Sequence, residues 1–122
     1  MNRSVLIKYL FRFFALLLIG AAFHHLYEYF VPELRPEYPA ARHILLFCIN
    51  LILAVFMLRR TKYFLPVLFL ISIQQLYGHG GRLIDSFSGS KAALYTDWVV
   101  VIFVPIILFS YYYDITRNGK DS

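Results

Sequence analysis

The sequence predicts an all-α integral membrane protein, a four-helix bundle of antiparallel transmembrane segments. Its 122 residues form one predicted domain, and 60% of them are hydrophobic, whereas soluble chains contain about 45–50% apolar residues. Only 16% of the residues are charged, and they gather between long apolar runs, which is the pattern of membrane spans and loops. Because Cys48 is the only cysteine, an internal disulfide and a cysteine-based metal framework are both excluded.

The first span is predicted over residues 5–30, a run rich in Leu, Phe and Ala. Lys8 and Arg12 lie near one end, where their long side chains can reach the membrane interface. The basic start and the later Gly20-Ala21-Ala22 also resemble a secretory signal with its cleavage site. We expect the segment to be retained as a span. The connector from Val31 to Pro39 contains three prolines, which cannot continue a helix.

The second span is predicted over residues 40–58 and stops at the basic turn Arg59-Arg60-Thr61-Lys62. So short a turn predicts that the second and third spans are antiparallel neighbours. The third span, 63–80, has Pro66 in its first turn, where a missing amide proton costs little. Residues 85–91 are predicted to form a solvated loop, because serine, glycine and charge gather there. The fourth span, 92–113, ends in three tyrosines typical of a membrane interface.

The orientation of the spans follows from the distribution of basic residues, which are enriched on the cytoplasmic side. With both termini on one side, that side carries eight of the 12 basic residues, and the net charge of +5 is concentrated there. The sequence therefore predicts cytoplasmic termini in a bacterial inner membrane. It does not indicate a nucleic-acid partner, since the basic residues sit at span ends. The eight are Arg3, Lys8, Arg12, Arg59, Arg60, Lys62, Arg117 and Lys120, against Arg35, Arg42, Arg82 and Lys91 on the other side.

Polar residues reach a common level toward the outer ends of all four predicted spans. With a helical rise of about 1.5 Å per residue, Glu28 and His43 lie about 24 Å from the inner ends, and His79 and Asp97 about 26 Å. His24 with Glu28, and Gln75 with His79, share a helix face, whereas His25 is expected on another face, at the interface. The candidate pocket residues are His24, Glu28, His43, Asn50, Gln74, Gln75, His79, Arg82 and Asp97. Each could instead serve interfacial contact or helix packing.

Several kinds of chemistry fit such a pocket. His24, His43 and His79 could ligate a metal or haem. A quinone or similar small molecule could bind to His and Gln side chains while Glu28 or Asp97 relays a proton. Proton-coupled transport and a purely structural role, as a subunit of a membrane complex or a homo-oligomer, remain alternatives. Because no catalytic nucleophile is present, the sequence favours a small-molecule-binding or redox-accessory protein over a self-sufficient enzyme. Glycines 78, 80 and 81 are expected to permit close approach of a helix or ligand.

Three segments of the chain resemble the DoxX-like family of small four-helix membrane proteins. They are the run Arg12-Phe-Phe-Ala-Leu-Leu-Leu-Ile-Gly-Ala-Ala-Phe-His24-His25, the proline-rich connector and the ending Met57-Leu58-Arg59-Arg60-Thr61. The similarity covers about three quarters of the chain and rests on degenerate motifs. It implies an association with membrane redox, sulfur or quinone metabolism. Asn50 stands where the family often carries a glutamate.

Overall fold

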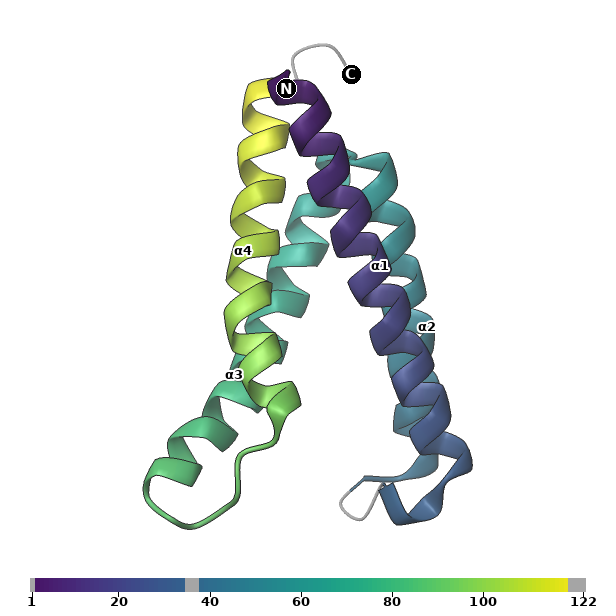
Figure 1. The fold of residues 1–122 in the computed structure, drawn as a ribbon, viewed down its shortest axis with the longest axis vertical. Coiled ribbons are helices and arrows are strands. Elements are labelled where there is room, and N and C mark those ends of the chain that lie inside the picture. The colour runs from purple at the N-terminus through teal and green to yellow at the C-terminus, as the bar shows by residue number, and fades with distance from the viewer. Residues whose placement is uncertain (1, 35–37, 119–122) are drawn as a thin grey trace. The chain divides into compact units, whose positions relative to one another are not determined.

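The computed structural model describes residues 2–34 and 38–118, and all regular structure in these ranges is helical. The chain divides into two compact units, Met1–Arg60 (unit 1) and Thr61–Ser122 (unit 2). Each unit is a pair of long α-helices joined by a connector (Figure 1).

Unit 1 consists of α1 (Arg3–Phe30) and α2 (Ala40–Arg59), which pack side by side (Figure 1). The side chain of Asn2 caps the first turn of α1 by accepting a hydrogen bond from the backbone N–H of Ser4 at 3.3 Å. A short 3-10 helix, Pro32–Leu34, follows α1. Arg60 ends α2 in the left-handed conformation, with φ of 52°. The C-terminal end of α1 lies next to the N-terminal end of α2, where Glu28 contacts His43.

Unit 2 consists of the 3-10 helix Lys62–Phe64, α3 (Leu65–Phe87) and α4 (Tyr95–Asn118). The hydroxyl of Tyr111, which is fully buried, donates a hydrogen bond to the backbone oxygen of Thr61 at 2.7 Å. Its ring also packs edge-on against Phe64. These contacts hold the C-terminal half of α4 against the start of unit 2. At the opposite end of the unit, residues 88–94 connect the C-terminal end of α3 to the N-terminal end of α4.

The helix boundaries agree with the predicted spans to within two residues, except around the loop of unit 2 and at the end of α4, which runs to Asn118 instead of residue 113. The third helix runs to Phe87 instead of residue 80, so the predicted loop is wrong for residues 85–87. Glycines and serines in this stretch weaken a helix without forbidding it. The fourth helix begins at Tyr95 instead of residue 92. Of the residues used in the sequence analysis, Arg35, Pro36 and Glu37 of the connector and Lys120 lie outside the described residues.

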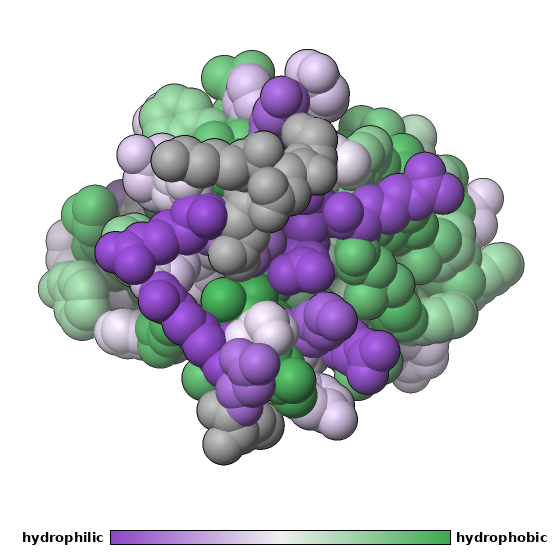
Figure 2. Space-filling model, turned by 90° about the horizontal axis from the view of Figure 1, so that it is seen from above, coloured by the Kyte–Doolittle hydropathy of each residue, from purple (hydrophilic) through white to green (hydrophobic). Residues whose placement is uncertain are grey.

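Three of the helices, α1, α2 and α4, are long and apolar enough to cross a membrane. Large apolar side chains are exposed along them, among them Leu16, Leu45 and Phe109, and the end-on view of Figure 2 shows apolar flanks with hydrophilic side chains gathered toward the viewer. Such surfaces are those of a membrane protein. The fourth predicted span, α3, is not among the three, because from residue 74 onward it contains the polar residues Gln74, Gln75, His79, Arg82 and Asp85.

Candidate functional site

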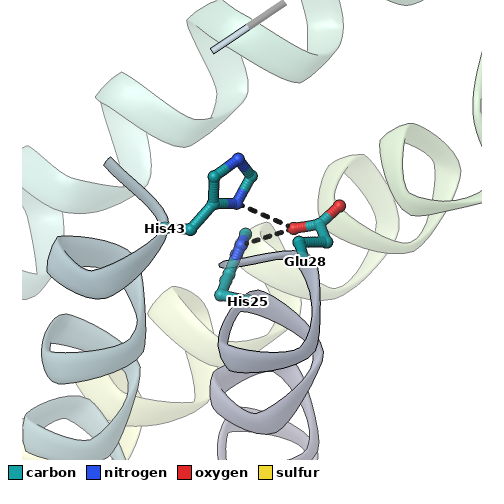
Figure 3. Close-up of side chains that lie close together, drawn as sticks. All are labelled: His25, Glu28 and His43. Carbon is teal, nitrogen blue, oxygen red and sulfur yellow. Dashed lines mark hydrogen bonds and ion pairs between the residues drawn. The ribbon is translucent and has the colours of Figure 1, made fainter. Parts of the chain in front are cut away.

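The polar cluster of unit 1 is centred on the carboxylate of Glu28, in the last turns of α1. Oε2 of Glu28 lies 3.0 Å from Nδ1 of His25 and 3.0 Å from Nδ1 of His43. Oε1, the other oxygen, lies 3.3 Å from Nε2 of His24. Figure 3 shows the two rings of His25 and His43 directed at the same carboxylate oxygen. Three imidazoles therefore surround one carboxylate, and His43 is contributed by the first turn of α2.

The exposed fraction of the side chains in this cluster falls from α1 to α2. The side chain of His24 is 38% exposed, that of Glu28 is 18% exposed, and that of His43 is only 5% exposed. Neither ring nitrogen of His43 forms a hydrogen bond within the described part of the chain. The 3.0 Å contact of His43 with Glu28 therefore has the length of an ion pair without the geometry of a hydrogen bond. A buried ring nitrogen without a hydrogen bond is costly, so this imidazole is a candidate ligand.

The atoms of this cluster are close enough to share one metal ion. One donor atom each from His25, Glu28 and His43 lies within 4.8 Å of the other two. We call these three residues the His–Glu site. Two imidazoles and one carboxylate form a common ligand set of zinc and of non-haem iron in proteins.

Unit 2 holds a second cluster, in which His79 of α3 meets Asp97 of α4. Nδ1 of His79 lies 2.7 Å from Oδ1 of Asp97, whose side chain is fully buried. The other oxygen, Oδ2, accepts the backbone N–H of Leu94 at 2.8 Å and so caps the first turn of α4. The guanidinium of Arg82 lies 3.9 Å from Oδ1. Both carboxylate oxygens are therefore engaged.

The predicted amides lie outside both clusters. Asn50 donates to the backbone oxygen of Leu46 in its own helix at 2.9 Å. Gln75 donates to the side chain of Gln74 at 2.7 Å. Neither hydrogen bond joins one helix to another.

The glycines of α3 do not mark a close approach between packed elements. A Cβ atom at Gly78, Gly80 or Gly81 would have no neighbouring atom within 4 Å beyond the backbone of its own helix turn and its chain neighbours. None of the three has a positive φ. The expected close packing at these glycines is therefore not found in the described structure, and a ligand contact there stays a prediction.

One member of the unit 1 cluster, His25, is not among the predicted pocket residues. Its predicted place on a different helix face from Glu28 is wrong, because residues three apart on a helix are neighbours as well as residues four apart. Glu28 with His43, and His79 with Asp97, were placed at matching depths, and each pair is in contact. Whether the two clusters line one pocket stays a prediction.

Comparisons with protein-family models, with curated proteins and with solved structures found no match.

Proposed function

We propose that this membrane protein binds one divalent transition-metal ion at the His–Glu site, through Nδ1 of His25, a carboxylate oxygen of Glu28 and Nδ1 of His43. The observation that carries the proposal is the buried ring of His43, which has no hydrogen-bond partner and directs Nδ1 at Glu28. Coordination would use the lone pair of this nitrogen, and the charge of Glu28 would offset part of the charge of the ion.

The distances are close to those between two ligands of one ion. Atoms that each lie about 2.1 Å from a metal are about 3.0 Å apart at 90° and about 3.4 Å apart at the tetrahedral angle of zinc. Nδ1 of His25 and Nδ1 of His43 each lie 3.0 Å from Oε2 of Glu28. Three ligands on one side of the ion leave positions open for water or a substrate, as in catalytic zinc and non-haem iron sites.

His24 supports the site from the outside. Its Nε2 contacts Oε1, the carboxylate oxygen that faces away from His25 and His43. A partner on the second oxygen orients a metal-binding carboxylate and raises the affinity for the ion. This assignment changes the ligand set predicted from the sequence, since His79 belongs to unit 2 and His25 takes its place.

Haem fits this cluster less well than a bare ion. A haem iron binds protein ligands only above and below the porphyrin ring. The Glu28 oxygen lies 3.0 Å from both imidazole nitrogens, in the space that the porphyrin would need. If the ion is iron, the site could exchange electrons, and this supports the redox-accessory role expected from the sequence.

We further propose that α3 also crosses the membrane, which gives an antiparallel four-helix bundle in a bacterial inner membrane. The distribution of basic residues supports this topology, because eight of the 12 then lie on the cytoplasmic side together with both ends of the chain. The His–Glu site would then lie near the outer surface, within reach of ions from outside the cell.

Equilibrium dialysis with elemental analysis tests the metal proposal. The purified protein is stripped with a chelator and then titrated separately with Zn²⁺ and, without oxygen, with Fe²⁺. We expect one ion per chain for at least one metal, and affinity reduced at least about 10-fold in Glu28→Gln and in His43→Ala. Asn50→Leu is the control, because Asn50 bonds only its own helix. Stoichiometric binding that is unchanged in both site variants, or no binding of either ion, would refute the proposal.

A further inference from the structure

Glu28 has a second carboxylate oxygen, Oε1, which is not in contact with His25 or His43. Figure 3 shows this oxygen pointing away from both of their rings. Nε2 of His24 lies 3.3 Å from it, across one turn of α1, because residues four apart on a helix are neighbours. A ring nitrogen and a carboxylate oxygen therefore face each other beside the His–Glu site.

These two atoms are about as far apart as two ligands of one ion. Ligand atoms that each lie about 2.1 Å from a zinc ion are about 3.4 Å apart at the tetrahedral angle, and Nε2 of His24 lies 3.3 Å from Oε1 of Glu28. The four-residue spacing is also the one at which the motif HExxH places two zinc ligands on one helix face. We call this pair of atoms the outer position.

The outer position is on the exposed side of the cluster. The side chain of His24 is 38% exposed, whereas those of His25, Glu28 and His43 are 24%, 18% and 5% exposed. An ion that arrives from the surroundings of the protein therefore meets His24 before it meets His43. Since Glu28 belongs to both positions, an ion can pass from one to the other without losing contact with this carboxylate.

We propose that a divalent transition-metal ion binds first at the outer position and then moves to the His–Glu site, with Glu28 as the shared ligand. This inference rests on the proposed metal site. In the transfer, the bonds of the ion to Nε2 of His24 and Oε1 of Glu28 break, and bonds to Oε2 of Glu28 and to Nδ1 of His25 and His43 form. No electron is transferred, and the ion leaves by the same steps in reverse.

A position on the route of the ion has a kinetic signature that a ligand of the bound ion lacks. The dissociation constant is the ratio of the dissociation and association rate constants, and it depends only on the free and bound states. Loss of a route therefore slows association and dissociation by the same factor. Loss of a ligand to the bound ion instead mainly speeds dissociation. Kinetics can thus separate the role of His24 from that of His25.

Stopped-flow absorption with Co²⁺, followed by release into excess chelator, measures both rate constants on the purified protein in detergent. In His24→Gln, association and dissociation should both slow at least about 10-fold, because the glutamine amide can still donate to Glu28 but is a poor ligand for a transition metal. His25→Gln is the matched contrast: its affinity should fall at least about 10-fold, mainly through faster dissociation. Wild-type rates in His24→Gln, or faster dissociation as in His25→Gln, would overturn the proposal.

A second variant protects the test against a substitution that only disturbs the helix. His24→Glu introduces a side chain of the same shape as glutamine, but its carboxylate oxygens can bind the ion. At a salt concentration that screens surface charge, it should associate at least about 10-fold faster than His24→Gln. Equally slow association in both variants would contradict the outer position. No binding of Co²⁺ by the wild type would refute the His–Glu site itself, whereas binding with unchanged rates in His24→Gln refutes the outer position alone.

Discussion

At the scale of single residues, His43 is the least expected side chain in the molecule. It lies in an apolar helix, is buried, and leaves both ring nitrogens without hydrogen bonds. Each unsatisfied buried polar group costs about 1–3 kcal/mol.

We therefore predict that His43→Leu separates stability from metal binding. Without metal, its free energy of unfolding should equal or exceed that of wild type by up to about 1–3 kcal/mol, since leucine removes two buried nitrogens that form no hydrogen bond. With saturating metal, only the wild type should be stabilised. Thermal unfolding with and without the ion measures both effects. Equal stabilisation of the two proteins by metal would contradict the prediction.

Part of the unit 1 cluster can be predicted from the sequence. Counting residues along each helix placed Glu28 level with His43, because helical rise is constant. It could not show that the His43 ring turns toward Glu28 without forming a hydrogen bond, since that depends on how α1 packs against α2. His25 could have been found from its three-residue spacing to Glu28.

At the scale of elements, α3 departs most from its prediction. The apolar runs located α1 and α2 to within two residues, whereas α3 continues seven residues past its predicted end at residue 80, to Phe87. Glycine and polar residues predict a loop here, but the contact of His79 with Asp97 holds this part of α3 against the first turn of α4. Tertiary contacts of this kind override local propensity.

We predict that Gly80→Ala stabilises α3 by up to about 1 kcal/mol, because alanine is the better helix former and has room there. Gly89→Ala is the contrasting variant: its φ of +77° is unfavourable for alanine, so we expect destabilisation by about 1 kcal/mol. Thermal unfolding followed by circular dichroism compares the two. Destabilisation by Gly80→Ala would contradict this account of α3.

At the scale of the whole molecule, the number of crossings decides where the chain ends lie. Three helices have the apolar character of a span and α3 lacks it. If only three cross, the ends lie on opposite sides of the membrane, and if α3 crosses as well they lie on the same side. The polar half of α3 is compatible with crossing because its His79 is paired with Asp97 rather than exposed to lipid unpaired.

We predict four crossings with both ends in the cytoplasm. In a Cys48→Ser background, single cysteines are placed at Ser4, Ser88 and Thr116 and treated with a membrane-impermeant maleimide. In intact bacterial cells only the cysteine at 88 should react, and the other two should react after permeabilisation. Labelling at 116 but not at 88 in intact cells would show three crossings instead.

The most direct measurement for the central claim is X-ray absorption spectroscopy of the metal-loaded protein. We predict scattering from two imidazole rings and from oxygen at about 2.0–2.2 Å. The contribution of one imidazole should disappear in His43→Ala. A spectrum without imidazole scattering, or one unchanged in that variant, would contradict a metal site formed by His25, Glu28 and His43.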